Sequence, residues 1–88
     1  MNAFTCTGFA RRDPDVRLTN GKRVAVFPVE VENETNSGRS TFDVIVLDSL
    51  ADYAEQHVRT NRQIFINGRI QRTGGSVSLH ARTLRVIL

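Results

Sequence analysis

Apolar and polar residues alternate along most of the chain, a pattern typical of strands that bury only one face. Runs rich in β-branched and aromatic residues predict five strands, at residues 4–9, 23–32, 41–47, 63–72 and 76–88. Pro28 inside the second run indicates an edge position or a bulge. Gly68 inside the fourth run indicates a bulge or a close approach of another backbone.

Turn and helix signals separate these runs. Asn20-Gly21 is a strong hairpin signal, residues 33–40 form a polar loop, and residues 73–75 predict a tight hairpin. Between the third and fourth strands, apolar residues at helical spacing predict a short amphipathic helix of about three turns. Asp48 and Ser49 are candidate helix caps, with Asp52 placed almost as in a capping box.

The order of three strands, one helix and two strands is that of the OB-fold. The sequence therefore predicts an all-β, five-stranded Greek-key barrel whose one short helix lies between strands 3 and 4. A chain of 88 residues is enough for one modest core, so residues 1–88 are expected to form a single domain. No apolar run is long enough to span a membrane, no signal peptide is visible, and the one cysteine suits a cytoplasmic protein.

Charge is distributed unevenly around a net value of +3. Residues 24–58 carry Arg39 against seven acids, whereas residues 59–88 carry six arginines and no acid. Eleven of the twelve cationic residues are arginine, which grips phosphate with a planar fork and stacks on bases. If the two basic ends meet in space, they form a face suited to nucleic acid.

Several segments resemble one known family. Gly8 followed by Asp13-Pro14-Asp15-Val16-Arg17 is similar to the G-x-x-x-x-D-P-E-V-R segment of bacterial single-stranded-DNA-binding proteins. The turn at residues 20–21 before the second strand, and residues 41–70, resemble the same family almost without a gap. This resemblance covers nearly the whole chain and implies an OB-fold that binds single-stranded DNA.

The chain departs from the family pattern in its aromatic residues. Aligned by motif, Phe42 keeps one base-stacking position, whereas Asp48, Thr35 and Gly75 replace aromatic residues at others. The hairpin at residues 73–75 is shorter than the family's binding loop, and no acidic-tipped tail follows Leu88. The short barrel and residues 79–81 also resemble primosomal replication protein B, a tailless dimeric relative.

The resemblance and the strand pattern together predict candidate DNA-binding residues. Phe42 shares a strand face with Val44 and Val46, which we expect to point outward as a base platform or a subunit contact. Phe65 is a second stacking candidate, whereas Phe4 and Phe27 are expected in the core. The candidate phosphate ligands are arginines on strand ends and loops: Arg11, Arg12, Arg17, Arg39, Arg69 and Arg72.

The sequence shows no pattern typical of a catalytic or metal-binding site. His57 and His80 have no partners at ligand spacing, and Cys6 reads as a small apolar residue. Gly74-Gly75 belongs to a hairpin and not to a phosphate loop. We therefore expect no enzyme activity, metal, cofactor or small-molecule substrate.

The leading hypothesis is non-sequence-specific binding of single-stranded DNA in replication, repair or recombination, by a homo-oligomer that is a dimer or a tetramer. First strands could pair between subunits along residues 2–7. One alternative is an accessory factor of the primosomal replication protein B type. The other is a protein-interaction barrel that has lost DNA binding.

Overall fold

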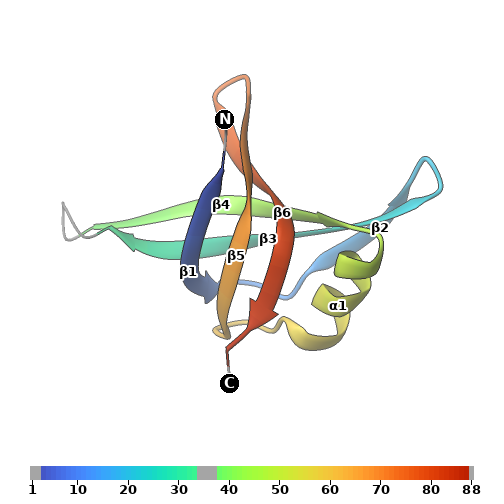
Figure 1. Ribbon diagram of the computed structural model, residues 1–88, viewed down its shortest axis with the longest axis horizontal. Helices are drawn as coiled ribbons and strands as arrows, with labels where there is room; N and C mark the ends of the chain where they lie inside the picture. The colour runs from blue at the N-terminus through green and yellow to red at the C-terminus, as the bar shows by residue number, and fades with distance from the viewer. Residues whose placement is uncertain (1–2, 34–37, 88) are drawn as a thin grey trace.

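The computed structural model describes residues 3–33 and 38–87, which form strands and one helix (Figure 1). In chain order the elements are β1 (Phe4–Ala10), β2 (Asp15–Thr19), β3 (Lys22–Asn33), β4 (Gly38–Leu47), α1 (Ser49–His57), β5 (Gln63–Thr73) and β6 (Ser76–Val86).

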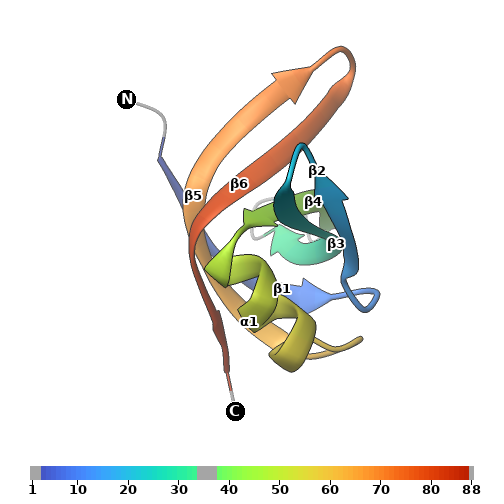
Figure 2. The same ribbon diagram turned by 90° about the vertical axis from the view of Figure 1, so that its right-hand side faces the viewer.

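The strands form one sheet that closes on itself. Its order is β1-β5-β6-β4-β3-β2, and β1 also pairs with β3, which completes a barrel. The β4–β6 pair is parallel and the other pairs are antiparallel. The β5–β6 hairpin extends beyond one end of the barrel, and α1 lies toward the other end (Figure 2). This topology confirms the predicted OB-fold.

The first strand of the barrel is divided into β1 and β2, and the sequence analysis predicted only the first part. Ala10 pairs with Val29 and Asp15 pairs with Val26, so residues 11–14 lie opposite residues 27–28. The chain bends between these two pairs. The extra length lets one continuous partner, β3, hold both halves.

Pro28 lies opposite this bend. It does not occupy an edge strand, as the sequence analysis had allowed, because β3 has β4 on one side and β1 and β2 on the other. The Pro28 carbonyl oxygen accepts a hydrogen bond from the Arg11 N–H at 2.9 Å. The Pro28 nitrogen, which carries no hydrogen, therefore faces the bend between β1 and β2. No ladder hydrogen bond is lost there.

Both predicted tight turns are present. Thr19 pairs with Lys22 around Asn20 and Gly21, whose φ angles are 52° and 78°. Two positive φ values are those of the type I′ hairpin turn. The β5–β6 hairpin turns in the same two-residue way at residues 74–75, with φ of 62° at Gly74.

The core is apolar throughout the described part of the chain. Phe27 is fully buried, as expected, whereas Phe4 and Cys6 are only half-buried against the core. This burial raises the pKa of the Cys6 thiol. The fully buried residues are Ala10, Ala25, Phe27, Val29, Val44, Val46, Ala51, Ala54, Val58, Ile64, Ile66, Leu79 and Leu84.

Gly68 marks a bulge and a close contact, as predicted. The β5–β6 register shifts between Asn67 and Gly68, which explains why buried positions in β6 pass from Leu79 to Leu84 across an odd number of residues. A Cβ atom at Gly68 would lie 2.2 Å from the backbone oxygen of His80. Only glycine lets β5 and β6 approach this closely.

Helix α1 begins differently from the prediction. Asp48 is the N-cap residue but makes no side-chain cap hydrogen bond, and its φ is 55° with ψ of −121°. Asp52 does not form a capping box; it instead pairs with Arg23 of β3, with Nε and Oδ1 2.6 Å apart. Arg23 also pairs with Glu55 at 2.6 Å, so one arginine ties the polar side of the helix to the barrel.

Replacing Gly68 with alanine is expected to lower the free energy of unfolding by about 2 kcal/mol or more, because the clash is with backbone and not with a flexible side chain. Gly75→Ala is the matched control, since a Cβ there meets nothing within 4 Å. Urea unfolding followed by circular dichroism measures both variants. Equal stability of the two variants would contradict this packing.

Replacing Asp48 with glycine is expected to raise the free energy of unfolding by about 1 kcal/mol, because relief of the positive φ outweighs the added flexibility of the unfolded chain. Asp48→Ala removes the same carboxylate but keeps the Cβ, so it should bring no gain. Thermal unfolding of the two variants separates backbone strain from charge. A gain in both variants would show that the carboxylate, and not the backbone, is unfavourable.

Candidate nucleic-acid interface

Side-chain alternation defines an outer face on β3 and β4. Ala25, Phe27 and Val29 of β3 are buried, so the residues between them point out of the barrel. The same holds in β4, where Val44 and Val46 are buried. We call the outward residues of these two strands the outer sheet face: Val24, Val26, Pro28, Glu30, Thr41, Asp43, Ile45 and Leu47.

Strand register extends this face across five strands. Ile45 of β4 pairs with Val26 of β3 and with His80 of β6. Val26 pairs in turn with Asp15 of β2, and His80 pairs with Arg69 of β5. A strip therefore runs across the barrel. The aliphatic residues Val26 and Ile45 lie at its centre, and the charged residues Asp15 and Arg69 lie at its ends.

The residue Arg17 lies at one border of the strip, beside Val24 on β3. It forms an ion pair with Asp15 at 2.8 Å, and both side chains are well exposed. Together with Thr19, Val24 and Val26, they line a hollow of about 350 Å³. An exposed pair of this kind is weak, so its guanidinium can exchange the carboxylate for another anion.

The opposite border of the strip has a second hollow. It measures about 410 Å³ and is lined by Arg69, Ile70, Gln71 and His80. The structure thus places Arg17 and Arg69 on the two sides of one aliphatic strip, as a basic groove requires.

The other predicted arginines differ in their surroundings. Arg12 is exposed beside Pro28 and Asp43, in a hollow next to the outer sheet face. Arg72 is exposed near the β5–β6 turn. The Arg39 side chain and Thr35 lie outside the described part of the chain, although the Arg39 backbone belongs to β4.

Arg11 points to another partner. It forms an ion pair with Glu30, and its Nη1 donates a hydrogen bond to Asn61 Oδ1 at 2.9 Å. These contacts join the bend after β1 to the loop before β5. Arg11 therefore has a structural role that the sequence analysis did not predict.

The expected outward stripe of Phe42, Val44 and Val46 is wrong. Val44 and Val46 are fully buried, and Phe42 is half-buried on the same inner side. Its ring meets Phe4 edge to face, with ring centroids 5.9 Å apart and planes at 85°. Alternation fixes which residues share a face, but the core here lies on the Phe42 side and not on the Asp43 side.

Phe65 lies on a different surface from the outer sheet face. It is half-buried on the outside of β5, where it pairs with Thr7 of β1 and Arg85 of β6. Phe9 on β1 and Ile87 directly after β6 are 44% and 41% exposed. The structure therefore does not bring Phe65 and Phe42 together.

Asp13 holds the bend that presents Arg12. The backbone N–H and the hydroxyl of Thr60 donate hydrogen bonds to Asp13 Oδ1 at 2.9 and 3.0 Å. These bonds favour the ionised form, so they hold the pKa of the Asp13 carboxyl below its usual range. The bend is thereby fastened to the loop that follows α1.

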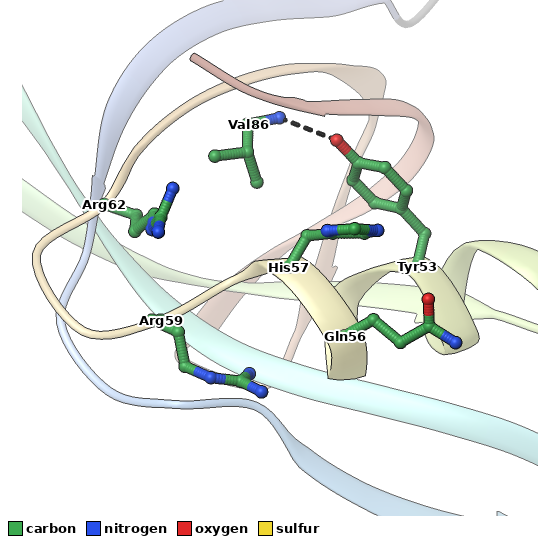
Figure 3. A pocket seen from close by; sticks show the side chains of 6 residues that line it. All are labelled: Tyr53, Gln56, His57, Arg59, Arg62 and Val86. Carbon is green, nitrogen blue, oxygen red and sulfur yellow. Dashed lines mark hydrogen bonds between the residues drawn. The ribbon is translucent and has the colours of Figure 1, made fainter. Parts of the chain in front are cut away.

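Sequence reasoning missed one basic site. Residues Tyr53, Gln56, His57, Arg59, Arg62 and Val86 line a hollow of about 370 Å³ at the end of α1 (Figure 3). The available signal was the run of six arginines without an acid over residues 59–88, but only the fold separates them into different sites.

The described residues offer neither a metal cluster nor a membrane-spanning helix. Among the described residues, no group of three or more histidine, cysteine, aspartate or glutamate side chains could hold a metal ion. No helix within residues 3–33 and 38–87 has the length and apolar character needed to cross a membrane.

Several solved structures of single-stranded DNA binding proteins, or of their domains, share this fold. The SSB domain of a Synechococcus sp. protein matches with a TM-score of 0.89 and 17% identity, over 97% of this chain and 94% of that one. A deletion mutant of the single-stranded DNA binding protein from Thermus aquaticus matches with a TM-score of 0.89 and 25% identity, over 100% of this chain but 42% of that one. The second single-stranded DNA binding protein from Mycobacterium smegmatis gives 0.87 and 16%, over 97% and 87%. A comparison with curated proteins found no match.

The strand order and the structural matches define an OB-fold domain. The model of the single-strand binding protein family matches residues 1–77, and the chain belongs to this family. Its members are DNA-binding proteins and not enzymes.

Replacing Asp13 with alanine is expected to lower the melting temperature at pH 7, because both Thr60 hydrogen bonds are lost. A carboxyl whose pKa is lowered by folding stabilises the protein above its unfolded pKa, and this contribution is lost as pH falls through the folded pKa. The gap between wild type and variant should therefore shrink as pH falls below about 4. Asp15→Ala is the control. A gap that persists unchanged at low pH would exclude the ionised carboxylate as the cause.

Proposed function

We propose that this domain binds single-stranded DNA without sequence specificity on the outer sheet face, in replication, repair or recombination. The observation that carries the proposal is the aliphatic strip of Val24, Val26 and Ile45 between Arg17 and Arg69. OB-folds bind nucleic acid on this pair of strands, between the loops that here are the turns at residues 20–21 and 74–75.

The phosphate backbone is held by arginines around the strip. Arg12, Arg17, Arg69 and Arg72 are exposed and border the outer sheet face or the adjoining hairpin. Arg39 extends the set along β4, and Arg11 contributes less because Glu30 and Asn61 engage it. Guanidinium groups bind phosphate oxygens in pairs whatever the base, which suits non-specific binding.

Base contacts come from aliphatic side chains. Phe42 faces Phe4 on the inner side, so Ile45 and Leu47 replace it in our proposal. Each lost aromatic stack weakens binding by about 1–3 kcal/mol. Phosphate contacts then provide a larger share of the affinity, and binding falls steeply with salt.

A homo-oligomer is supported by an open strand edge. Residues 4–7 of β1 pair with β5 on one side, and β1 pairs with β3 only through Phe9 and Ala10. An unpaired edge is a template for another strand, and a second copy of β1 satisfies it antiparallel. A dimer also joins two binding faces, which lengthens the bound strand.

A protein-interaction barrel is the second candidate function. The surface with Phe9, Phe65 and Ile87 is partly apolar and centres on the β1–β5 pair, whereas the outer sheet face centres on β3 and β4. A domain of this kind would contact a partner protein there and bind DNA weakly or not at all. An accessory role like that of primosomal replication protein B rests on the short barrel and on residues 79–81.

Fluorescence anisotropy of labelled, unphosphorylated oligo-dT at several salt concentrations tests the proposal. With four to five phosphate contacts, the logarithm of the association constant should fall with the logarithm of salt at a slope of about −3 to −3.5. Arg17→Ala or Arg69→Ala should make the slope shallower by about 0.7 each.

Arg85→Ala is the matched control, because Arg85 is an exposed arginine beside Phe65 on the other surface. It should leave the slope unchanged. An equal effect of all three substitutions would contradict a defined groove. No binding at low salt by the folded protein would favour the protein-interaction barrel.

A further inference from the structure

The hollow at the end of α1 has a one-sided charge. Its lining contains two arginines, a histidine and an amide, and no acid: Tyr53, Gln56, His57, Arg59, Arg62 and Val86. The side chains come from the helix, from the loop after it and from the end of β6 (Figure 3). A ligand of this hollow must therefore be anionic.

The nearby acids are engaged by other residues. Glu55 pairs with Arg23 on the barrel side of the helix, at 2.6 Å. Asp13 accepts two hydrogen bonds from Thr60 and also interacts electrostatically with Arg59. Neither acid forms an ion pair with Arg62, so this guanidinium keeps its charge available to a ligand.

The two arginines have different roles. Arg59 Nη1 donates to the carbonyl oxygens of Glu55 and Val58, both at 2.7 Å, which fixes the guanidinium at the helix end. The Arg62 side chain makes no hydrogen bond or ion pair with another described residue. It lies on the far side of the hollow from Tyr53 in Figure 3. One cation is therefore preorganised and the other is free to bind.

An aromatic wall completes the hollow. The rings of Tyr53 and His57 have centroids 4.6 Å apart, and the Tyr53 hydroxyl oxygen accepts a hydrogen bond from the Val86 N–H at 3.0 Å. That bond holds the phenol ring in place. A fixed aromatic surface beside one preorganised and one free guanidinium group suits a base and a phosphate of the same nucleotide.

We propose that this hollow is a second nucleotide site, which binds a nucleotide carrying a terminal phosphate. The phosphate binds Arg62 and Arg59, and the base lies against Tyr53 and His57. The site lies at the end of α1, and its lining shares no residue with the outer sheet face. The nucleotide is either free or the 5′-phosphorylated end of a strand.

Titration of the ¹⁵N-labelled protein with thymidine 5′-monophosphate, followed by NMR, tests the site. Binding should shift the signals of Tyr53, His57 and Arg62, and thymidine or inorganic phosphate alone should bind more weakly. Arg62→Ala should weaken binding by about tenfold, because a charge-assisted hydrogen bond is lost. Lys22→Ala removes one exposed cation elsewhere and is the control.

The outcomes separate this site from the proposed function. Arg62→Ala should bind unphosphorylated oligo-dT like the wild type, and only the wild type should prefer the 5′-phosphorylated oligomer. Preference for the phosphorylated oligomer without binding of the monophosphate would assign the site to strand ends, and the converse to free nucleotides. Absent shifts in the hollow with both the monophosphate and the 5′-phosphorylated oligomer, or equal losses in Arg62→Ala and Lys22→Ala, would overturn the proposal whatever the result for unphosphorylated oligo-dT.

Discussion

Closure of the barrel depends on two places where backbones approach with no side chain between them. A Cβ atom at Gly8 would lie 2.6 Å from the backbone oxygen of Glu30, and one at Gly68 would lie 2.2 Å from that of His80. The first glycine lets β1 reach β3, and the second lets β5 lie close to β6 where the register shifts. These contacts set how β1 lies against β3 and how β5 lies against β6, and so which side chains of these strands point outward.

Much of the fold was predictable because its signals are local. The Asn20-Gly21 turn, the helix before β5 and the glycine at the bulge each depend on a few adjacent residues. β2 was missed because its pairing with β3 depends on how the chain bends after Ala10, which is a tertiary property. The predicted capping box was also wrong, because Asp52 pairs with Arg23 on a distant strand.

The site was less predictable than the fold. Alternation placed Phe42, Val44 and Val46 on one face but did not say which face was buried. The charged neighbour Asp43 was the available signal, since a barrel interior accepts valine more readily than a carboxylate. The hollow at the helix end joins Tyr53 to Arg62 and Val86, so no local pattern could reveal it. Arg59 and Arg62 line this hollow, whereas Arg69 and Arg72 lie near the outer sheet face or its hairpin.

Binding of single-stranded DNA on the outer sheet face is tested most directly by an NMR map of the ¹⁵N-labelled protein during titration with short unphosphorylated oligo-dT. If the strand lies on the outer sheet face, the largest shifts will fall on Val26, Ile45 and His80 and on the two turns that flank them. Shifts concentrated around Thr7 and Phe65 would contradict the account, because those residues lie on the surface assigned here to protein contacts.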